Sequence, residues 1–451
     1  MSHAKPAAPN VPRGVDESRR RLLFGASALP LVASASLSVG SSTARAAVNT
    51  SARIVIAGSG LGGLAIASRL SRELSGAKIT IIDRKEIHNY QPGYTLVATG
   101  IWPVEKVSDR NADLMPAGVE WVREMVEEFD PEANAVVTDS GKRVEYDYLV
   151  VATGLHLDFA QIEGMDIAAI GTHGLGCVYP SPEAAQATWV AMDRFRQRGG
   201  QALMTLPATP LKCAGAPLKM TFMIADRLKQ AGTRSASKVD FHSALDNIFS
   251  VPSINAEVLR RWAELDIPVT FNSKLVAVDI GTRRATVTSP EGERTEIGYD
   301  FIHVVPPMRA PDSVKNSPLS WKEGGFAAGG WLEVDPKSLR HRRFPNVFGL
   351  GDINGTAKGK TAATVKKSAP LVAQNLIDVI AGREPSQVFD GYTSCPLLLR
   401  EGSALLVEFD YNNNLTPSLP MIDPLQDSYF AWVMKYRLLK PAYMAVAKGR
   451  V

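Results

Sequence analysis

The chain has 451 residues, of which 45% are hydrophobic and 21% are charged. This length and composition predict a folded protein of more than one domain and exclude a disordered, fibrous or disulfide-scaffold protein. The formal net charge of +4 is carried by residues 1–46, because the rest of the chain holds equal numbers of basic and acidic groups. A folded body without a basic excess is not expected to bind nucleic acid.

Residues 1–46 have the pattern of an export signal. Consecutive arginines at 19–21 precede a weakly apolar run rich in Ala and Ser at 22–39, and a small-x-small cleavage site ends at Ala46. Paired arginines before such a run are typical of the twin-arginine route. The alternative is an N-terminal membrane anchor, but serines dilute the run below the roughly 20 apolar residues that a span needs. We therefore expect a twin-arginine-type signal peptide and an exported protein.

Residues 53–83 carry a dinucleotide-binding pattern. A short apolar strand leads into a glycine-rich turn, a helix follows over 64–74, and a second strand at 78–83 ends on an acid. Glycines in this turn allow the backbone to approach a pyrophosphate, the helix N-terminus favours phosphate, and the acid can accept from a ribose hydroxyl. The residues expected at this cofactor site are Gly58, Ser59, Gly60, Gly62, Gly63, Asp83 and Arg84.

Two later segments indicate which dinucleotide binds. In flavoproteins with two dinucleotide-binding folds, a strand ending in Ala-Thr-Gly crosses between domains, and a later strand ending in Gly-Asp places its acid on the ribityl chain of FAD. Both patterns occur here, at 146–154 and 346–352. We therefore expect FAD and an α/β fold with two Rossmann-like dinucleotide-binding domains, as in glutathione-reductase-like flavoproteins. The additional cofactor residues are Ala152, Thr153, Gly154, Gly351 and Asp352.

The second Rossmann-like unit lacks a glycine fingerprint for a nicotinamide nucleotide. Its strand at 201–207 ends on Pro207 and is followed by a turn that contains Pro210, Cys213 and Pro217. Proline has no amide proton and fixes the backbone, so this turn is a poor cradle for a pyrophosphate. We expect the reductant to be a compound that meets Cys213 instead of NAD(P)H.

The chain has three cysteines, at 177, 213 and 395, and its seven histidines are scattered, so no metal site is expected. Cys213 lies at a strand–turn–helix junction facing the expected flavin, and Cys395 follows the third FAD segment. We expect these two to form a redox-active pair that closes as a disulfide in an oxidising compartment. The alternative is that they are buried small hydrophobes. For Cys177, a third redox cysteine and an inert buried residue are equally supported.

Over roughly residues 52–451 the chain resembles the sulfide:quinone oxidoreductases of the disulfide-reductase superfamily, in particular the branch that includes the mitochondrial enzyme. Both cysteine motifs occur in order, which makes the resemblance specific. The segments that carry it are residues 88–96, 212–217, 303–308, 341–352 and 391–396.

This resemblance implies that Cys213 and Cys395 are the catalytic pair, bridged directly or through an extra sulfur when oxidised. Sulfide would leave a persulfide on Cys395, and two electrons would pass through FAD to a membrane quinone. A thiol, sulfite or further sulfide would then remove the sulfane sulfur. The resemblance also implies FAD contacts from Gln91, Val126, Lys360 and Thr361, and non-covalent FAD because no cysteine stands in residues 90–95.

A cation beside the catalytic thiol would favour its thiolate form. Lys212 and Lys219 are the candidates, and the alternative is that both are solvated charges at a helix end.

The C-terminal residues 428–451 carry five basic residues, no acid and several aromatic side chains. We expect two short helices broken by Pro441 that lie in the membrane interface, where the quinone is, with the basic charges next to anionic lipid. The alternative is a basic tail that packs on the body or on a second subunit. The expected location is the periplasmic face of the inner membrane.

The expected organisation follows from these segments. A signal peptide at 1–46 precedes the first part of the FAD-binding domain at 47–160 and the second Rossmann-like domain at 161–325. The second part of the FAD-binding domain at 326–400 is followed by a C-terminal quinone and membrane-interface region at 401–451. An oligomer is compatible with this organisation.

Three other functions stay open from the residues. One is a sulfide dehydrogenase that passes electrons to a cytochrome c, as in flavocytochrome c. Another is a non-catalytic flavin redox sensor, and the last is an NADH:quinone dehydrogenase, which the missing second fingerprint disfavours.

Overall fold

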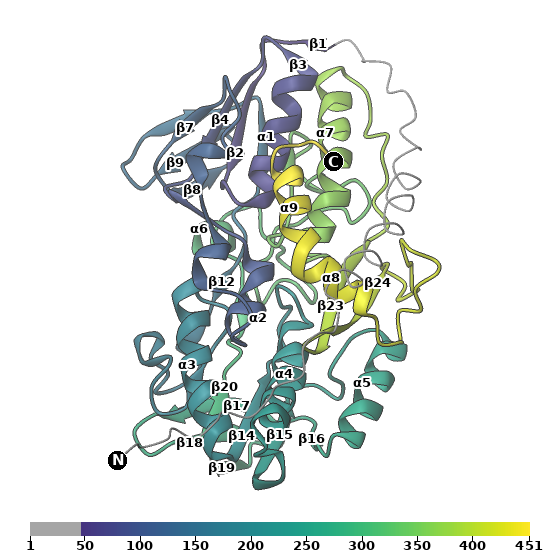
Figure 1. Ribbon diagram of the computed structural model, residues 1–451. Coiled ribbons are helices and arrows are strands. Elements are labelled where there is room, and N and C mark those ends of the chain that lie inside the picture. The colour runs from purple at the N-terminus through teal and green to yellow at the C-terminus, as the bar shows by residue number, and fades with distance from the viewer. Residues whose placement is uncertain (1–46) are drawn as a thin grey trace, which may run out of the picture. The chain divides into compact units, whose positions relative to one another are not determined.

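The computed structural model describes residues 47–451, which form one compact unit. The predicted signal peptide and its cleavage site lie outside the described residues. Two five-stranded parallel sheets organise the fold, and they lie one above the other in Figure 1. The prediction of an α/β fold with two parallel sheets is therefore confirmed.

The first sheet combines strands from the two ends of the chain. Its central strand β2 reads Arg-Ile-Val-Ile-Ala and is almost wholly buried, because a parallel strand has both faces covered. In spatial order the sheet contains β22 (Val347–Gly349), β11 (Tyr148–Val151), β2 (Arg53–Ala57), β4 (Lys78–Ile82) and β7 (Glu120–Val122).

The second sheet is built from the middle of the chain. In spatial order it contains β13 (Leu175–Gly176), β20 (Phe301–His303), β14 (Gly200–Leu206), β15 (Ser237–Ser243) and β16 (Val269–Thr270).

Five longer helices pack around these sheets. Helix α4 is buried on nearly all sides, consistent with its sequence being apolar around most of its circumference. The five are α1 (Leu61–Glu73), α3 (Pro182–Arg198), α4 (Ala216–Ala231), α5 (Pro252–Glu264) and α7 (Ala362–Ile380).

Short antiparallel elements complete the two lobes. The three-stranded sheets are β8 (Val126–Asp130), β9 (Ala135–Thr138), β10 (Arg143–Glu145), and β17 (Lys274–Asp279), β18 (Arg284–Thr288), β19 (Arg294–Gly298). The two-stranded pairs are β1 (Val48–Asn49) with β3 (Leu74–Ser75), β5 (Ile87–Asn89) with β6 (Ser108–Arg110), β12 (His156–Leu157) with β21 (Met308–Arg309), and β23 (Thr393–Arg400) with β24 (Ser403–Phe409). The short helices are α2 (Tyr94–Val97) and α6 (Asp312–Lys315).

The C-terminal segment is a continuous helical run. It consists of α8 (Tyr429–Val433), a π-helical turn (Met434–Leu438) and α9 (Leu439–Ala447), and α9 lies beside α1 and α7 in Figure 1. The predicted break at Pro441 is wrong, because the helical run continues through this proline, which lies in the first turn of α9 directly after the π-helical turn. No helix in residues 47–451 is long and apolar enough to cross a membrane.

Candidate functional site

The glycine-rich turn joins β2 to α1 at the carboxyl edge of the first sheet. Gly58 has a φ of +108°, which favours glycine. A Cβ on Gly63 would lie 1.8 Å from the Gly58 carbonyl oxygen, so only glycine lets the helix pack this closely on the strand. A Cβ on Gly60, by contrast, would meet nothing within 4 Å. The turn therefore leaves open space in front of the N-terminus of α1.

Asp83 follows β4 and faces this turn. Its Oδ2 accepts hydrogen bonds from the Ser59 amide at 2.7 Å and from the Ser59 hydroxyl at 3.0 Å, and its Oδ1 accepts from the Lys85 amide. Arg84, the next residue, points elsewhere and forms an ion pair with Asp139.

The other predicted cofactor segments meet the turn from β11 and β22. A Cβ on Gly58 would clash with the Ala152 carbonyl, and one on Gly62 would lie 3.2 Å from the Leu350 carbonyl. The Thr153 hydroxyl oxygen is buried without a hydrogen-bond partner in the described residues. Of the remaining predicted residues in these segments, Gly154 and Gly351 both have positive φ.

The segment before α7 holds the predicted cofactor residues Lys360 and Thr361. The Lys360 ammonium donates to the carbonyls of Asp352 and Asn354 and lies 3.6 Å from the centroid of the Trp331 ring. Burial lowers the pKa of Lys360 to about 7 and raises that of the Asp352 carboxyl. Thr361 is the N-cap of α7 and accepts from the Thr364 amide.

The remaining predicted cofactor residues, Gln91 and Val126, make none of the contacts described above. Gln91 is exposed in a 3₁₀ turn, and Val126 is buried at the start of β8.

The structure brings Cys213 and Cys395 together from 182 residues apart, with 3.7 Å between their Sγ atoms. Cys213 precedes α4, and Cys395 lies on β23, which packs against α4. Both are free thiols in this structure. The Cys213 amide donates to the Lys360 carbonyl at 2.9 Å, so the cysteine pair adjoins the third predicted cofactor segment.

The residues around Cys213 allow the Cys395 sulfur to approach the Cys213 sulfur closely. Cys213 has a left-handed φ of +51°, a strained conformation for a residue other than glycine. A Cβ on Gly215 would lie 2.5 Å from the Cys395 Sγ, so glycine is required for the second sulfur to reach the first. Pro217 stands in the first turn of α4, where its missing amide proton costs no hydrogen bond.

Two buried lysines surround the cysteine pair. The Lys219 ammonium donates to the Cys213 Sγ at 3.2 Å, and Lys435 donates to the Pro92 carbonyl. A hydrogen bond from Cys395, together with the charges of Lys219 and Lys435, holds the pKa of the Cys213 thiol well below its usual range despite burial. The pKa of the Cys395 thiol is raised by its hydrogen bond to Cys213 and by burial. The Lys219 contact and both pKa shifts therefore favour the thiolate form on Cys213.

Lys219 was predicted from the sequence as a cation beside the catalytic thiol, but Lys435 was not. Lys219 is 2% exposed, so its alternative as a solvated charge is wrong. Lys212 bonds the Tyr179 carbonyl instead of a cysteine. Nothing in the local sequence distinguishes Lys435 from the other basic residues of the C-terminal segment.

Cys177, the third cysteine, lies in the hydrophobic core. It is 0% exposed on β13's C-terminal side and packs in the hydrophobic core. Burial raises the pKa of its thiol to about 12, which makes it a poor nucleophile.

The C-terminal segment packs on the body more than was predicted. Lys435 is buried and Lys440 pairs with Asp109 at 2.9 Å, so the expectation of five lipid-facing charges is wrong. The run packs against the body through the buried Trp432 and Tyr443, and Tyr443 bonds to His88. Large apolar side chains of this region remain exposed, namely Met421, Tyr429, Phe430 and Leu438.

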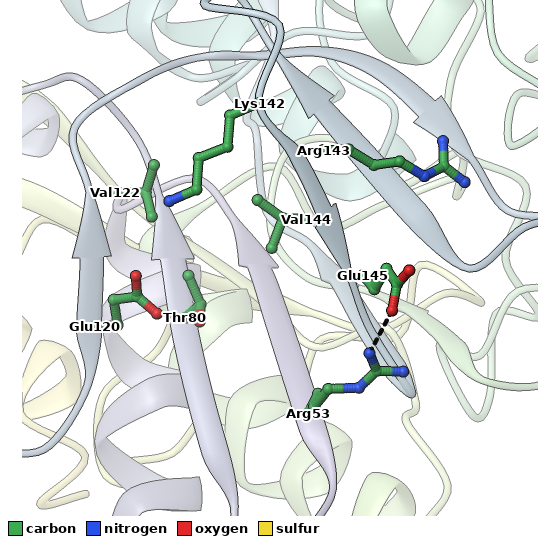
Figure 2. A pocket seen from close by; sticks show the side chains of 8 residues that line it. All are labelled: Arg53, Thr80, Glu120, Val122, Lys142, Arg143, Val144 and Glu145. Atoms are coloured by element: carbon green, nitrogen blue, oxygen red, sulfur yellow. Dashed lines mark hydrogen bonds and ion pairs between the residues drawn. The ribbon is translucent and has the colours of Figure 1, made fainter.

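A separate surface pocket of about 430 Å³ lies beside β2, β4, β7 and β10. Figure 2 shows its polar lining, with Arg53 paired to Glu145 and Lys142 and Arg143 nearby. None of the predicted site residues lines this pocket.

Comparison with known proteins identifies the family of this chain. Residues 52–192 match the family model of pyridine nucleotide-disulphide oxidoreductases. The chain is 36% identical over 401 residues to the mitochondrial sulfide:quinone oxidoreductase of Dictyostelium discoideum, covering 88% of this chain and 86% of that protein. It is 32% identical to the mouse mitochondrial sulfide:quinone oxidoreductase, covering 86% of this chain and 85% of that protein.

The chain belongs to the sulfide:quinone oxidoreductase family. It is of the mitochondrial type, as the resemblance in the sequence implied. The crystal structure of the Aquifex aeolicus sulfide:quinone oxidoreductase has the same fold, with a TM-score of 0.72 and 22% identity over 89% of this chain and 92% of that one.

Membership of the sulfide:quinone oxidoreductase family and its flavoprotein superfamily implies FAD. The residues present fit this cofactor. The turn at Gly60 leaves space for a pyrophosphate, the first turn of α1 holds no acid that would repel one, and the buried Thr153 hydroxyl lacks a partner in the described residues.

Proposed function

We propose that this protein oxidises sulfide to sulfane sulfur with the Cys213–Cys395 pair and passes two electrons through FAD to a membrane quinone. The observation that carries this proposal is the contact of the two sulfurs at 3.7 Å beside the Lys219 ammonium. It combines a thiolate, a second thiol in reach and a buried cation, which thiol–disulfide exchange requires.

The oxidised enzyme starts with a disulfide between the two cysteines. Hydrosulfide attacks the Cys395 Sγ, the bond to Cys213 breaks, and its electron pair remains on Cys213 as a thiolate. Cys395 now carries a persulfide. Lys219 stabilises the thiolate, because an ammonium at hydrogen-bond distance favours the anion in a buried site.

A thiolate, sulfite or a second hydrosulfide then attacks the outer sulfur of the Cys395 persulfide. The sulfur–sulfur bond breaks, the acceptor leaves with the sulfane sulfur, and Cys395 is left as a thiolate. When bound, FAD supplies the two-electron acceptor for closure of the disulfide, and a quinone takes up the two electrons with two protons.

We assign the roles at the cofactor as follows. The turn from Gly58 to Gly63 binds the pyrophosphate of a non-covalent FAD, and Asp83 binds the ribose. Asp352 holds the ribityl chain, and Lys360 with Thr361 lies toward the flavin ring. The domain boundaries at 160, 325 and 400 belong to this proposal, because β22 joins the first sheet after the chain has completed the second.

We assign the membrane-facing surface to Tyr429, Phe430, Leu438 and Met421. These side chains are 50–79% exposed, although they are large and apolar. Exposed apolar side chains on a short helical run, here Tyr429, Phe430 and Leu438, with Met421 in the preceding loop, suit reversible binding to a bilayer that contains the quinone. Location on the periplasmic face is proposed from the signal-like sequence of residues 1–46 alone.

An anaerobic sulfide titration of the purified protein tests the function. Sulfide should bleach the flavin band or produce a long-wavelength charge-transfer band, and a short-chain quinone should restore the oxidised spectrum. Cys213→Ser and Cys395→Ser should both lose the response. Bleaching by NADH but not by sulfide would overturn the proposal.

The same titration separates the other candidate functions. The signal-like sequence favours a cytochrome c acceptor as the second candidate, which predicts reoxidation by cytochrome c but not by quinone. A flavin redox sensor predicts a band that sulfide does not change.

A further inference from the structure

A chain of buried polar side chains leads from the dinucleotide-binding turn to the C-terminal helix α9. Each of its members is at most 9% exposed. In spatial order they are Asp83, Ser59, Asn111, His88 and Tyr443. The His88–Tyr443 hydrogen bond alone joins residues that are 355 positions apart in the sequence.

Four hydrogen bonds join these groups. The Ser59 hydroxyl lies 3.0 Å from the Asp83 Oδ2, and the Asn111 Nδ2 lies 2.5 Å from the Ser59 Oγ. The His88 Nδ1 lies 3.3 Å from the Asn111 Oδ1, and the His88 Nε2 lies 2.8 Å from the Tyr443 hydroxyl.

The chemistry of the groups sets the direction of each donor. The Asn111 Nδ2 also donates to the Lys85 carbonyl at 2.7 Å, which fixes the orientation of the amide. Its Oδ1 can only accept, so His88 carries a proton on Nδ1. Burial lowers the pKa of His88 and keeps the ring neutral, so its Nε2 accepts from the Tyr443 hydroxyl.

All four donors consequently point from α9 toward the Asp83 carboxylate. A hydrogen-bond chain with one direction polarises each of its members and orders them together. Loss of the Tyr443 hydroxyl would leave the His88 Nε2 without its donor and remove the polarisation that the bonds through Asn111 and Ser59 pass on to Asp83.

We propose that His88 and Tyr443 are positioning residues for the FAD ribose site, so that docking of α9 and binding of FAD strengthen each other. This rests on the proposed assignment of Asp83 to the FAD ribose. The coupling is reciprocal, because a change in FAD affinity caused by α9 requires an equal change in α9 docking caused by FAD.

The first test is Tyr443→Phe in the FAD-loaded, full-length protein. The substitution removes one hydroxyl and keeps the ring that packs edge-on against Tyr90 at 4.9 Å. The FAD dissociation constant, followed by the fluorescence of released flavin, should rise roughly three- to tenfold, the loss expected for one buried hydrogen bond. Tyr436→Phe is the matched control, because this hydroxyl makes no hydrogen bond in the described residues, and it should leave the constant unchanged.

A double-substitution cycle distinguishes positioning from simple stabilisation of α9. In a Ser59→Ala background the chain is already broken, so Tyr443→Phe should cause no further loss of FAD affinity. Asn111→Ala breaks the chain at a second point and should give the same result. An equal loss in every background, or no loss in the wild-type background, would overturn the proposal.

The reciprocal effect is measured on the C-terminal segment itself. FAD should slow proteolysis of residues 428–451 in the wild-type protein and in Tyr436→Phe, and it should slow it less in Tyr443→Phe. Equal protection in all three proteins contradicts the coupling. Neither measurement uses sulfide, so failure of this coupling and failure of the proposed activity are observed separately.

Discussion

The Lys219 ammonium and the Cys213 sulfur lie 3.2 Å apart, and Lys219 is 2% exposed. The contact arises because Cys213 lies in the turn before α4, and Lys219 lies in the first turn of that helix. Although burial lowers the pKa of Lys219, the two cysteine sulfurs raise it above its usual value, which is the counterpart of the lowered Cys213 pKa. The effect of this buried ion pair on the Cys213 thiol can be tested by substitution.

Replacement of Lys219 should raise the pKa of the Cys213 thiol. Lys219→Met keeps most of the side-chain volume and removes the charge, so the thiolate fraction at neutral pH should fall about tenfold for each pKa unit. The ultraviolet thiolate absorbance against pH and the rate of flavin reduction by sulfide measure this. Lys229→Met, an exposed position near the end of the same helix, is the control and should change neither quantity.

Gly215→Ala should separate the two sulfurs. The new Cβ would lie 2.5 Å from the Cys395 Sγ, and β23 must move to relieve the contact. We expect loss of disulfide formation, measured by mass spectrometry of alkylated protein after mild oxidation, and a fall of tenfold or more in sulfide-dependent reduction. Gly298→Ala adds a Cβ with nothing within 4 Å and should behave as wild type. Normal disulfide formation in Gly215→Ala would contradict the observed packing.

Lys435 should give the reaction a pH dependence near neutrality. Burial lowers its pKa to about 7, and the charged or titratable groups that face it are Lys219, Cys213 and Cys395. Below this pH the ammonium adds positive potential at the cysteines, and above it the neutral amine does not. At constant hydrosulfide concentration, the KM for hydrosulfide should rise as the pH increases through about 7.

Lys435→Met should remove this step and keep the higher KM at every pH. Lys448→Met, which changes a basic residue beyond the end of α9, should retain it. An unchanged pH profile in Lys435→Met would exclude Lys435 as the group responsible.

Cys177 should be dispensable for sulfide oxidation. Its thiol is wholly buried with a pKa raised to about 12, so it should resist alkylation in the folded protein under conditions that label Cys213. Cys177→Ala should retain sulfide-dependent flavin reduction and lose about 1 kcal/mol of unfolding free energy through the small cavity. Loss of the reaction in a folded, FAD-loaded Cys177→Ala protein would instead show that Cys177 takes part as a third redox cysteine.

Phe430→Asp should weaken binding to the membrane without affecting the cysteines. Phe430 is 50% exposed on α8, and a charge there opposes insertion into the apolar part of the interface. Co-sedimentation with anionic lipid vesicles should fall severalfold, while reduction by sulfide and reoxidation by a short-chain quinone stay unchanged. Val388→Asp, at a position 69% exposed, is the control and should bind vesicles normally.

The dinucleotide turn was predictable from the sequence because its parts are consecutive. Strand β2, the glycines from Gly58 to Gly63, helix α1 and strand β4 follow one another over about thirty residues, and Gly58 and Gly63 meet steric requirements that only glycine satisfies. The motif around Cys213 was readable for the same reason.

Contacts between distant segments were decided by the tertiary structure. The C-terminal basic residues look alike in sequence, yet Lys435 is buried beside the cysteines, Lys440 pairs with Asp109, and Arg437 stays exposed. Tyr443 packs against Tyr90 and bonds to His88, and Lys435 donates to the Pro92 carbonyl, so these contacts are made with a segment more than 300 residues away. Local sequence patterns report short-range geometry, whereas the burial and pairing of a charge depend on which remote segments enclose it.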